Sequence, residues 1–383
     1  MAVDETRVRR LDSMTGLRFF AALSVFLFHA GSMRVFRTST PEPDPFARIT
    51  AHGGSLGVTF FFVLSGFILT WSARTYDTVG QFWRRRLVKI FPNHLVGFAL
   101  SLVLFASVGA AVLPAVLNLT LLHAWVPRMD TFLSFNYVTW SLSCELLFYL
   151  LFPFLLKAVR RIPAERLWWA VGLVVALVLC VPLVAEQLPT EPRFQLALGG
   201  QGFREPIVQY WFVFTFPLVR LLDFLLGILM ARTVLEDRWI GLRRLPALAL
   251  LVAAYVLADH TPYHYSLNAV LLLPMALLIP AVACHEANGG RSFLSGRLML
   301  RLGETSFALY MLHILVLVRA RRELGFRTVL SPLHGIGWIL LTLVVSLVAA
   351  RLLYVLVERP ASRYLGTSRR RPTAAGPGPA GAL

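Results

Sequence analysis

The sequence is poor in charged residues and in cysteine. Only 15% of its 383 residues are charged and 57% are hydrophobic, whereas a soluble domain has about 25% charged residues. The mean hydropathy is +0.67, so a soluble globular protein is excluded. The three cysteines, Cys144, Cys180 and Cys284, lie in apolar runs without paired or metal-like spacing. We therefore predict neither a disulfide framework nor a metal site.

Acidic residues and lysine are also scarce. The chain has 20 Asp and Glu against 37 Lys and Arg, a net charge of +17, and only 2 of the 37 are Lys. In a soluble protein this charge would suggest nucleic acid. Here the basic residues form short clusters between apolar runs, which is how a membrane chain sets its orientation. We predict a lipid bilayer and no nucleic acid as partner, and the arginine bias is a compositional hint of an actinobacterial genome.

The apolar runs predict a chain that crosses the membrane many times. A span needs about 20 apolar residues, and ten runs come close to that length, the seventh being short. The first run lacks a good cleavage site and is interpreted as a retained span, not a signal peptide. The run 113–125 is shorter and is predicted to be re-entrant or interfacial. The ten predicted spans are 15–33, 55–72, 87–109, 137–156, 167–185, 208–231, 245–258, 266–284, 302–318 and 337–357.

The distribution of basic residues predicts that both termini are cytoplasmic. With the N-terminus inside, the inner segments hold about 23 Lys and Arg and the outer ones about 10, as the positive-inside rule requires. One outer cluster goes against the rule: Arg319, Arg321, Arg322 and Arg327. The predicted fold is an all-α polytopic bundle in a bacterial plasma membrane. Residues 1–365 form its transmembrane domain, and residues 366–383, rich in Gly, Pro and Ala, form a disordered cytoplasmic tail.

A few ionisable residues lie inside the predicted spans, where they are costly and face the bundle interior. Arg18 and His29 are eleven residues apart, so they share one helix face about 16 Å apart along the axis. His29 then lies in the outer half of the membrane, where Glu145 and His313 could converge with it. The full set is Arg18, His29, Glu145, Arg220, Asp223, His313, Arg351 and, at the inner end of the last span, Glu358.

Each of these residues has a catalytic and a structural interpretation. A neutral His29 could take a proton from a hydroxyl if a neighbouring carboxylate, first of all Glu145, oriented it. It could equally be an interhelical hydrogen bonder. Arg18 could simply snorkel to the interface. Arg220 and Asp223, three residues apart on one helix, favour a structural ion pair, and Glu358 could merely end the last helix.

A cationic patch precedes the third span. Together with Arg18 it could hold the phosphates of a nucleotide-like ligand, although stop-transfer charge alone explains such a patch. In the second span, Ser65 and Gly66 are small enough for close helix packing or ligand access. The patch consists of Arg84, Arg85, Arg86 and Lys89.

The order of these motifs resembles that of the acyltransferase 3 family of integral membrane O-acyltransferases, from about residue 11 to residue 363. Six segments match in order. They are Arg18 with His29, GVTFFFVLSGF (57–67), RRRLVKIFP (84–92), WSLSCELLFY (Trp140, Ser141, Leu142, Ser143, Glu145, Phe148 and Tyr149), the Gly303, Ser306, Tyr310 and His313 segment, and Glu358 with Pro360.

The resemblance implies transfer of an acyl group from acyl-CoA to a hydroxyl, without a metal. It implies that His29 is the base and that Arg18 is its functional partner. We expect Glu145 to orient His29 in the catalytic site and Tyr149 or Ser65 to steady the oxyanion. Two acids common in relatives are replaced here by Thr59 and Leu146, so their roles do not carry over. The further residues placed at the substrate site are Trp140, Ser141, Arg220, Asp223, Tyr310 and His313.

The acceptor is the least constrained part of the prediction. The chain looks closer to actinobacterial members that acylate macrolide antibiotics than to cell-wall acetylases. We therefore expect an acetyl, propionyl or similar group to move to a macrolide-like antibiotic or another glycosylated metabolite. One alternative is O-acetylation of envelope polysaccharide or a lipid-linked sugar. A proton-coupled transporter would also keep charges in its spans, but the sequence shows no inverted repeat.

Overall fold

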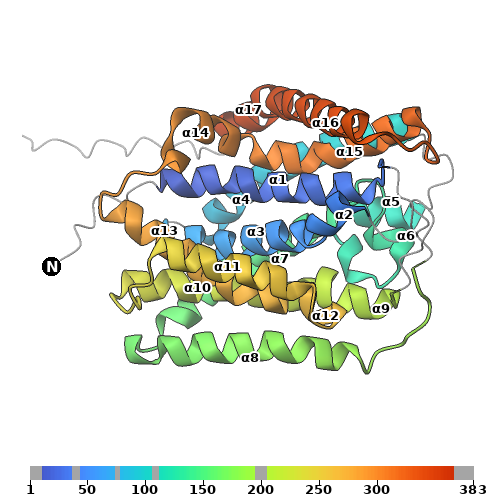
Figure 1. The fold of residues 1–383 in the computed structure, drawn as a ribbon. Coiled ribbons are helices and arrows are strands. Elements are labelled where there is room, and N and C mark those ends of the chain that lie inside the picture. The colour runs from blue at the N-terminus through green and yellow to red at the C-terminus, as the bar shows by residue number, and fades with distance from the viewer. Residues whose placement is uncertain (1–10, 37–43, 74–77, 106–111, 195–204, 366–383) are drawn as a thin grey trace, which may run out of the picture.

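The computed structural model describes residues 11–36, 44–73, 78–105, 112–194 and 205–365. Over these residues the chain forms helices and no β-strand, with two isolated bridges, Phe36 to Leu330 and Arg193 to Pro206. The long helices lie side by side with their axes roughly aligned (Figure 1). This confirms the predicted all-α membrane bundle.

The membrane-spanning helices agree with the predicted runs. Eight segments are long and apolar enough to cross a membrane, or nine if α14 (Arg297–Glu304) and α15, which meet at a bend of 60°, count as one span. The seventh predicted span is α11 (Arg244–Ala258), whose 15 residues rise only about 22 Å. The long helices are α1 (Asp12–Ser32), α3 (Gly53–Trp71), α4 (Val79–Phe105), α7 (Trp140–Arg160), α8 (Leu167–Ala185), α10 (Pro217–Leu235), α13 (Ala269–Ala287), α15 (Ser306–Leu324) and α16 (Pro332–Leu353).

Several helices begin earlier than the apolar pattern predicts, α1 and α4 among them. The carboxylate of Glu286 accepts hydrogen bonds from the backbone N–H groups of Asp12 and Ser13, at 2.8 and 2.9 Å, and so satisfies the free amides at the start of α1. Helix α4 begins at Val79, eight residues before the predicted start, so the cationic patch is helical. The predicted tail, 366–383, and the end of the predicted span 87–109 lie outside the described residues.

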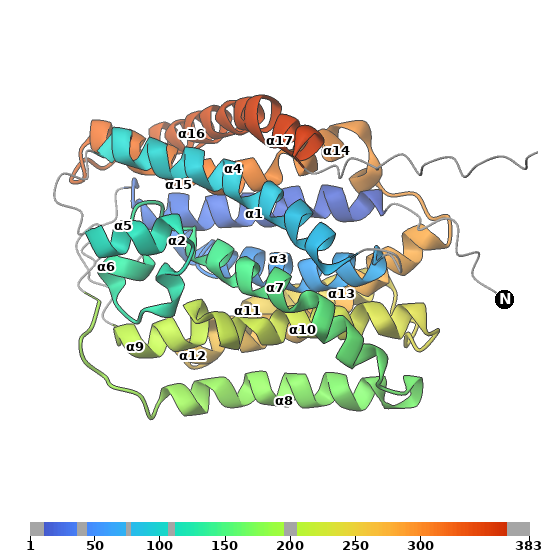
Figure 2. The same ribbon diagram turned by 180° about the vertical axis from the view of Figure 1, so that it is seen from behind.

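Short helices gather at one end of the bundle (Figures 1 and 2). The segment 113–125, predicted not to span, forms α5 and η1 there. The short helices at this end are α2 (Pro45–Ile49), α5 (Val112–Leu119), η1 (His123–Trp125), α6 (Met129–Phe132), α9 (Ile207–Tyr210) and α12 (Tyr263–Ser266). The remaining elements are η2 (Ala164–Arg166), η3 (Trp211–Thr215), η4 (Phe293–Ser295), η5 (Tyr354–Glu358) and α17 (Arg359–Tyr364).

Helix α3 lies against both α1 and α10, and glycines set these contacts. A Cβ on Gly66 would lie 2.0 Å from the carbonyl oxygen of Phe224, and one on Gly227 would lie 2.0 Å from that of Val63. Gly57 also lies close to α1, because a Cβ on it would be 2.5 Å from the Ala21 carbonyl oxygen. Small residues thus let three helix backbones approach closely, which confirms the packing interpretation of Gly66.

The arginine cluster that breaks the orientation rule is bound to the protein. Arg321 is 2% exposed, and its guanidinium donates to the carbonyl oxygens of Gly325, Phe326 and Thr328 at the end of α15. Arg319 pairs with Glu323 on the same helix, and Arg322 lies over the ring of Phe105, 4.7 Å from its centroid. Arg321 thus closes the loop after α15, while Arg319 and Arg322 have partners within the protein.

Candidate active site

A cavity of about 110 Å³ lies among α1, α3, α4, α7 and α15. Most of its wall is apolar. The apolar residues are Val58, Phe61, Phe62, Leu64, Ile68, Leu69, Ile90, Leu142 and Phe307, and the polar ones are Arg18, Ser65, Arg86, Lys89, Ser141, Glu145, Tyr149 and Tyr310.

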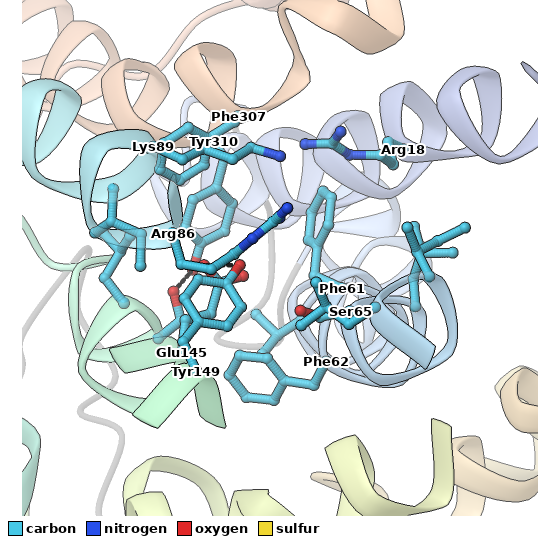
Figure 3. A pocket seen from close by; sticks show the side chains of 17 residues that line it. Arg18, Phe61, Phe62, Ser65, Arg86, Lys89, Glu145, Tyr149, Phe307 and Tyr310 are labelled. Atoms are coloured by element: carbon cyan, nitrogen blue, oxygen red, sulfur yellow. Dashed lines mark hydrogen bonds between the residues drawn. The ribbon is translucent and has the colours of Figure 1, made fainter. Parts of the chain in front are cut away.

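Three cationic side chains converge on one side of this cavity. Figure 3 shows Arg18 on α1 and Lys89 on α4 pointing toward each other, with Arg86 one helical turn before Lys89. Glu145 is the one carboxylate in the wall, and Lys89 and Arg18 both act on it electrostatically. Three like charges in a low-dielectric site repel one another. The wall therefore suits an anion such as a phosphate group.

Polar groups also lie on the α7 side of the cavity. The hydroxyl of Tyr149 donates to Glu145 Oε2 at 3.4 Å, and the hydroxyls of Ser141 and Tyr310 are 2.8 Å apart. Ser65 faces the same space from α3. Both predicted oxyanion donors, Ser65 and Tyr149, therefore line the cavity.

Only two residues of the cationic patch line the cavity. Arg86 and Lys89, three residues apart, share the face toward the cavity, whereas Arg84 and Arg85 are not among its lining residues. Arg84 donates instead to the carbonyl oxygen of Leu365, at 2.9 Å. One turn beyond Lys89, Asn93 donates to Oε2 of the buried Glu358 at 2.8 Å. Glu358 thus links the last helices to α4 and does more than end a helix.

The two histidines of the predicted site contact each other. His29 Nδ1 on α1 lies 3.0 Å from His313 Nε2 on α15, and the two ring centroids are 5.1 Å apart. His313 is fully buried, and Tyr310, one turn earlier on α15, lines the cavity. The histidine pair therefore lies about one helical turn from the cavity.

The expected convergence of His29, Glu145 and His313 is only partly right. The structure joins the two histidines, while Glu145 lies in the cavity beside Tyr149, Lys89 and Arg18. Glu145 enters from α7 and His313 from α15, and relative depth on separate helices depends on where each helix begins. The ring nitrogen of His29 that was expected to contact a carboxylate, Nδ1, contacts the imidazole of His313 instead.

Arg220 and Asp223 form the expected ion pair in the core. Both side chains are fully buried, with Arg220 Nη2 2.9 Å from Asp223 Oδ2. Asn268 donates to Asp223 Oδ1 at 2.9 Å, and Thr59 donates to Asn268 at 3.0 Å and accepts from Arg220 at 3.2 Å. The hydroxyl of Thr59 thus ties α3 to α10 and to Asn268, which directly precedes α13.

Trp140 supports the site from outside the cavity. Its ring lies 4.8 Å from that of Phe214 and 6.3 Å from that of Phe62, centroid to centroid.

The apolar wall of the cavity was not predicted from the sequence. A signal was present, because Val58, Phe62 and Ser65 recur at helical spacing and so share one face of α3 with Phe61 and Leu69.

Comparison with known proteins identifies the family of this chain. Residues 11–354 match the protein family described as "Acyltransferase domain". The acyltransferase MdmB of Streptomyces mycarofaciens is 40% identical over 98% of this chain and 97% of its own length. A putative peptidoglycan O-acetyltransferase of Bacillus subtilis is 24% identical over 92% of this chain and 55% of its own length.

A putative O-acetyltransferase of Staphylococcus aureus is 22% identical over 81% of this chain, which spans about half of that protein's length. No solved structure matches the chain. The family match covers most of the sequence, including every segment that builds the cavity and the histidine pair. The chain belongs to the acyltransferase 3 family, the membrane acyltransferases that its motifs resemble.

Proposed function

We propose that this protein is an O-acyltransferase of the bacterial plasma membrane that moves a short acyl group from acyl-CoA to a hydroxyl of a macrolide-like metabolite. One observation carries the proposal. A cationic cavity wall and a histidine pair share helix α1, with Arg18 at one end and His29 three turns away. A donor with a phosphate end and a reactive end fits such a site.

The cationic wall would bind the phosphates of the donor. Arg18, Arg86 and Lys89 supply donors from two helices, and charge-assisted hydrogen bonds to phosphate contribute about 1.5–3 kcal/mol each. The cavity of about 110 Å³ is small beside the roughly 300–1,000 Å³ of ordinary ligand pockets. It therefore suits a slender part of the donor.

His29 would act as the general base. The acceptor hydroxyl gives its proton to an imidazole nitrogen of His29, and its oxygen bonds to the thioester carbonyl carbon. The C–S bond then breaks, and the proton passes from His29 to the thiolate sulfur of the leaving CoA. General-base catalysis of this kind contributes about 10²–10⁴-fold in rate. Tyr149 or Ser65, which line the cavity, would donate to the oxyanion.

The choice of acceptor rests on similarity. The chain is 40% identical to a Streptomyces acyltransferase over 98% of its length, while it is 24% identical to the putative peptidoglycan O-acetyltransferase of Bacillus subtilis. A secondary metabolite is therefore the first acceptor to test. Envelope glycans come second.

The test is release of free CoA by purified protein given acetyl-CoA or propionyl-CoA and a hydroxylated macrolide, with mass spectrometry of the product. We expect one acyl group to be added and the His29→Ala variant to lose at least about 10²-fold in kcat. Normal transfer by that variant would refute the role of His29 as the general base. If only envelope glycans are acylated, the acceptor is an envelope glycan and not a macrolide. Macrolide flux into vesicles without acyl-CoA would favour a transporter.

A matched pair of variants tests the donor site. Arg86→Gln should raise the KM for acyl-CoA by about 10-fold or more, because a charge-assisted contact is lost. Arg84→Gln removes the same charge from the same helix but from a residue that bonds to the Leu365 carbonyl. It should leave that KM unchanged. Equal effects of the two variants would contradict a phosphate site at the cavity wall.

A further inference from the structure

The backbone around His313 decides where its proton lies. Its Nδ1 faces two carbonyl oxygens of its own helix, those of Leu309 at 3.1 Å and Tyr310 at 2.8 Å. Carbonyl oxygens only accept hydrogen bonds, so Nδ1 must carry the hydrogen. In the neutral ring Nε2 is then left with a lone pair, and it is this atom that faces His29.

The same reasoning assigns the proton of His29. Its Nδ1 lies 3.0 Å from the carbonyl oxygen of Val25 and 3.0 Å from Nε2 of His313. Both neighbours are acceptors, so Nδ1 of His29 is the donor. Two independent contacts thus agree on one tautomer. The other nitrogen, Nε2, keeps the lone pair that a general base needs.

Both rings are held in place by packing. His313 is fully buried, and the ring of Phe26 lies 6.3 Å from it. The ring of Phe28 meets His29 edge-on at 5.0 Å between centroids. In the described part of the chain, the hydrogen bonds of these two imidazoles go to each other and to helix carbonyls. No carboxylate takes part in them.

We propose that His313 is the positioning residue of the base. It accepts from His29 Nδ1–H, which fixes the tautomer and leaves Nε2 of His29 to take the acceptor proton. This inference rests on the proposed function, and it assigns to an imidazole the part that a carboxylate has in a serine-protease triad. When His29 is protonated, its Nδ1–H bond to the neutral His313 becomes charge-assisted, which stabilises the imidazolium until the proton passes to the departing thiolate.

Two variants of His313 test its positioning role by activity. His313→Leu removes the acceptor and should lower kcat by about 10²-fold, with the KM values of both substrates unchanged. His313→Gln can place its Oε1 near the former Nε2 and accept from His29, so it should keep kcat within about 10-fold of the native value. Native kcat in His313→Leu would overturn the proposal, as would equal losses in both variants when each elutes as a folded, monodisperse protein.

The His29→Ala variant separates this inference from the proposed function. If His29→Ala is inactive while His313→Leu is fully active, the base stands and the positioning role of His313 falls. If His29→Ala is fully active, the proposed base itself is wrong, whatever the His313 variants show.

A spectroscopic measurement tests the tautomer directly. Nitrogen NMR of ¹⁵N-histidine-labelled protein in micelles, with His29 assigned by its loss in His29→Ala, should show a protonated Nδ1 and an unprotonated Nε2. His313→Leu should give a mixture of tautomers, whereas His313→Gln should keep the native one. A native His29 protonated at Nε2 would overturn the proposal. So would an unchanged tautomer in His313→Leu, and neither signal depends on activity.

Discussion

The buried ion pair of α10 makes a sharp prediction about stability. The substitution Asp223→Asn changes one charge and almost no volume, and the new amide oxygen can still accept from Asn268. Arg220 would then be a buried cation without its counter-ion. We expect this variant to lose about 3–5 kcal/mol in the free energy of unfolding, because breaking one side of a buried pair leaves an uncompensated charge.

The structure sets this magnitude. Both side chains are fully buried and the charged atoms are 2.9 Å apart, so solvent does not screen the pair. The guanidinium of Arg220 also lies 5.1 Å from the ring centroid of Phe62 and 5.6 Å from that of Phe214. Each such contact contributes about 0.5–2 kcal/mol. Both remain in Asp223→Asn and limit the loss.

The control is the double replacement Arg220→Met with Asp223→Leu. Removing both charges should recover most of the loss, since apolar residues of similar volume often replace a buried pair at little cost. The partners Thr59 and Asn268 lose one bond each, so recovery is incomplete. The assay is equilibrium unfolding in mixed micelles titrated with a denaturing detergent. A single variant that loses less than about 1 kcal/mol, or a double variant no more stable than the single one, would refute the reasoning.

Two further predictions concern packing and orientation. Gly66→Ala should lower the thermal stability of the purified protein by about 1–3 kcal/mol, because its Cβ would lie 2.0 Å from the Phe224 carbonyl oxygen. The control Gly172→Ala meets nothing within 4 Å and should be neutral, so equal effects would contradict the helix contact. For orientation, Leu333→Cys and Tyr364→Cys place exposed thiols at 78% and 81% exposed positions. In intact cells an impermeant reagent should label the first and not the second, and the reverse pattern would place the termini outside.

Residues along a single helix were predictable. The spacing of Arg18 and His29 follows from helix geometry, and the structure keeps both on α1 at that separation. The Arg220 and Asp223 ion pair was predictable for the same reason, since residues three apart are neighbours in any α-helix. The division of the cationic patch could be predicted only in part, because both Arg85 and Arg86 share a helix face with Lys89 by spacing, while the structure places only Arg86 with Lys89 in the cavity wall.

Contacts between helices were harder to predict. The depth of Glu145 relative to His29 depends on where α7 and α1 begin, and apolar runs locate helix ends only to within a few residues. The capping of α1 by Glu286 was equally hard to predict, since the two segments are more than 270 residues apart along the chain.

The sequence by itself determined that this is a helical membrane protein, because a bilayer admits few spanning structures and requires long apolar runs. The order of its motifs gave the resemblance to the acyltransferase 3 family, which the family match shows. Tertiary structure alone decided the partners of each polar group. It joined His29 to His313, moved Glu145 to the cationic cavity and selected which basic residues line it. The physical reason is that composition sets which segments enter lipid, whereas close contacts such as those of Gly66 with Phe224 and of Gly227 with Val63 set how closely and at what level the helices meet.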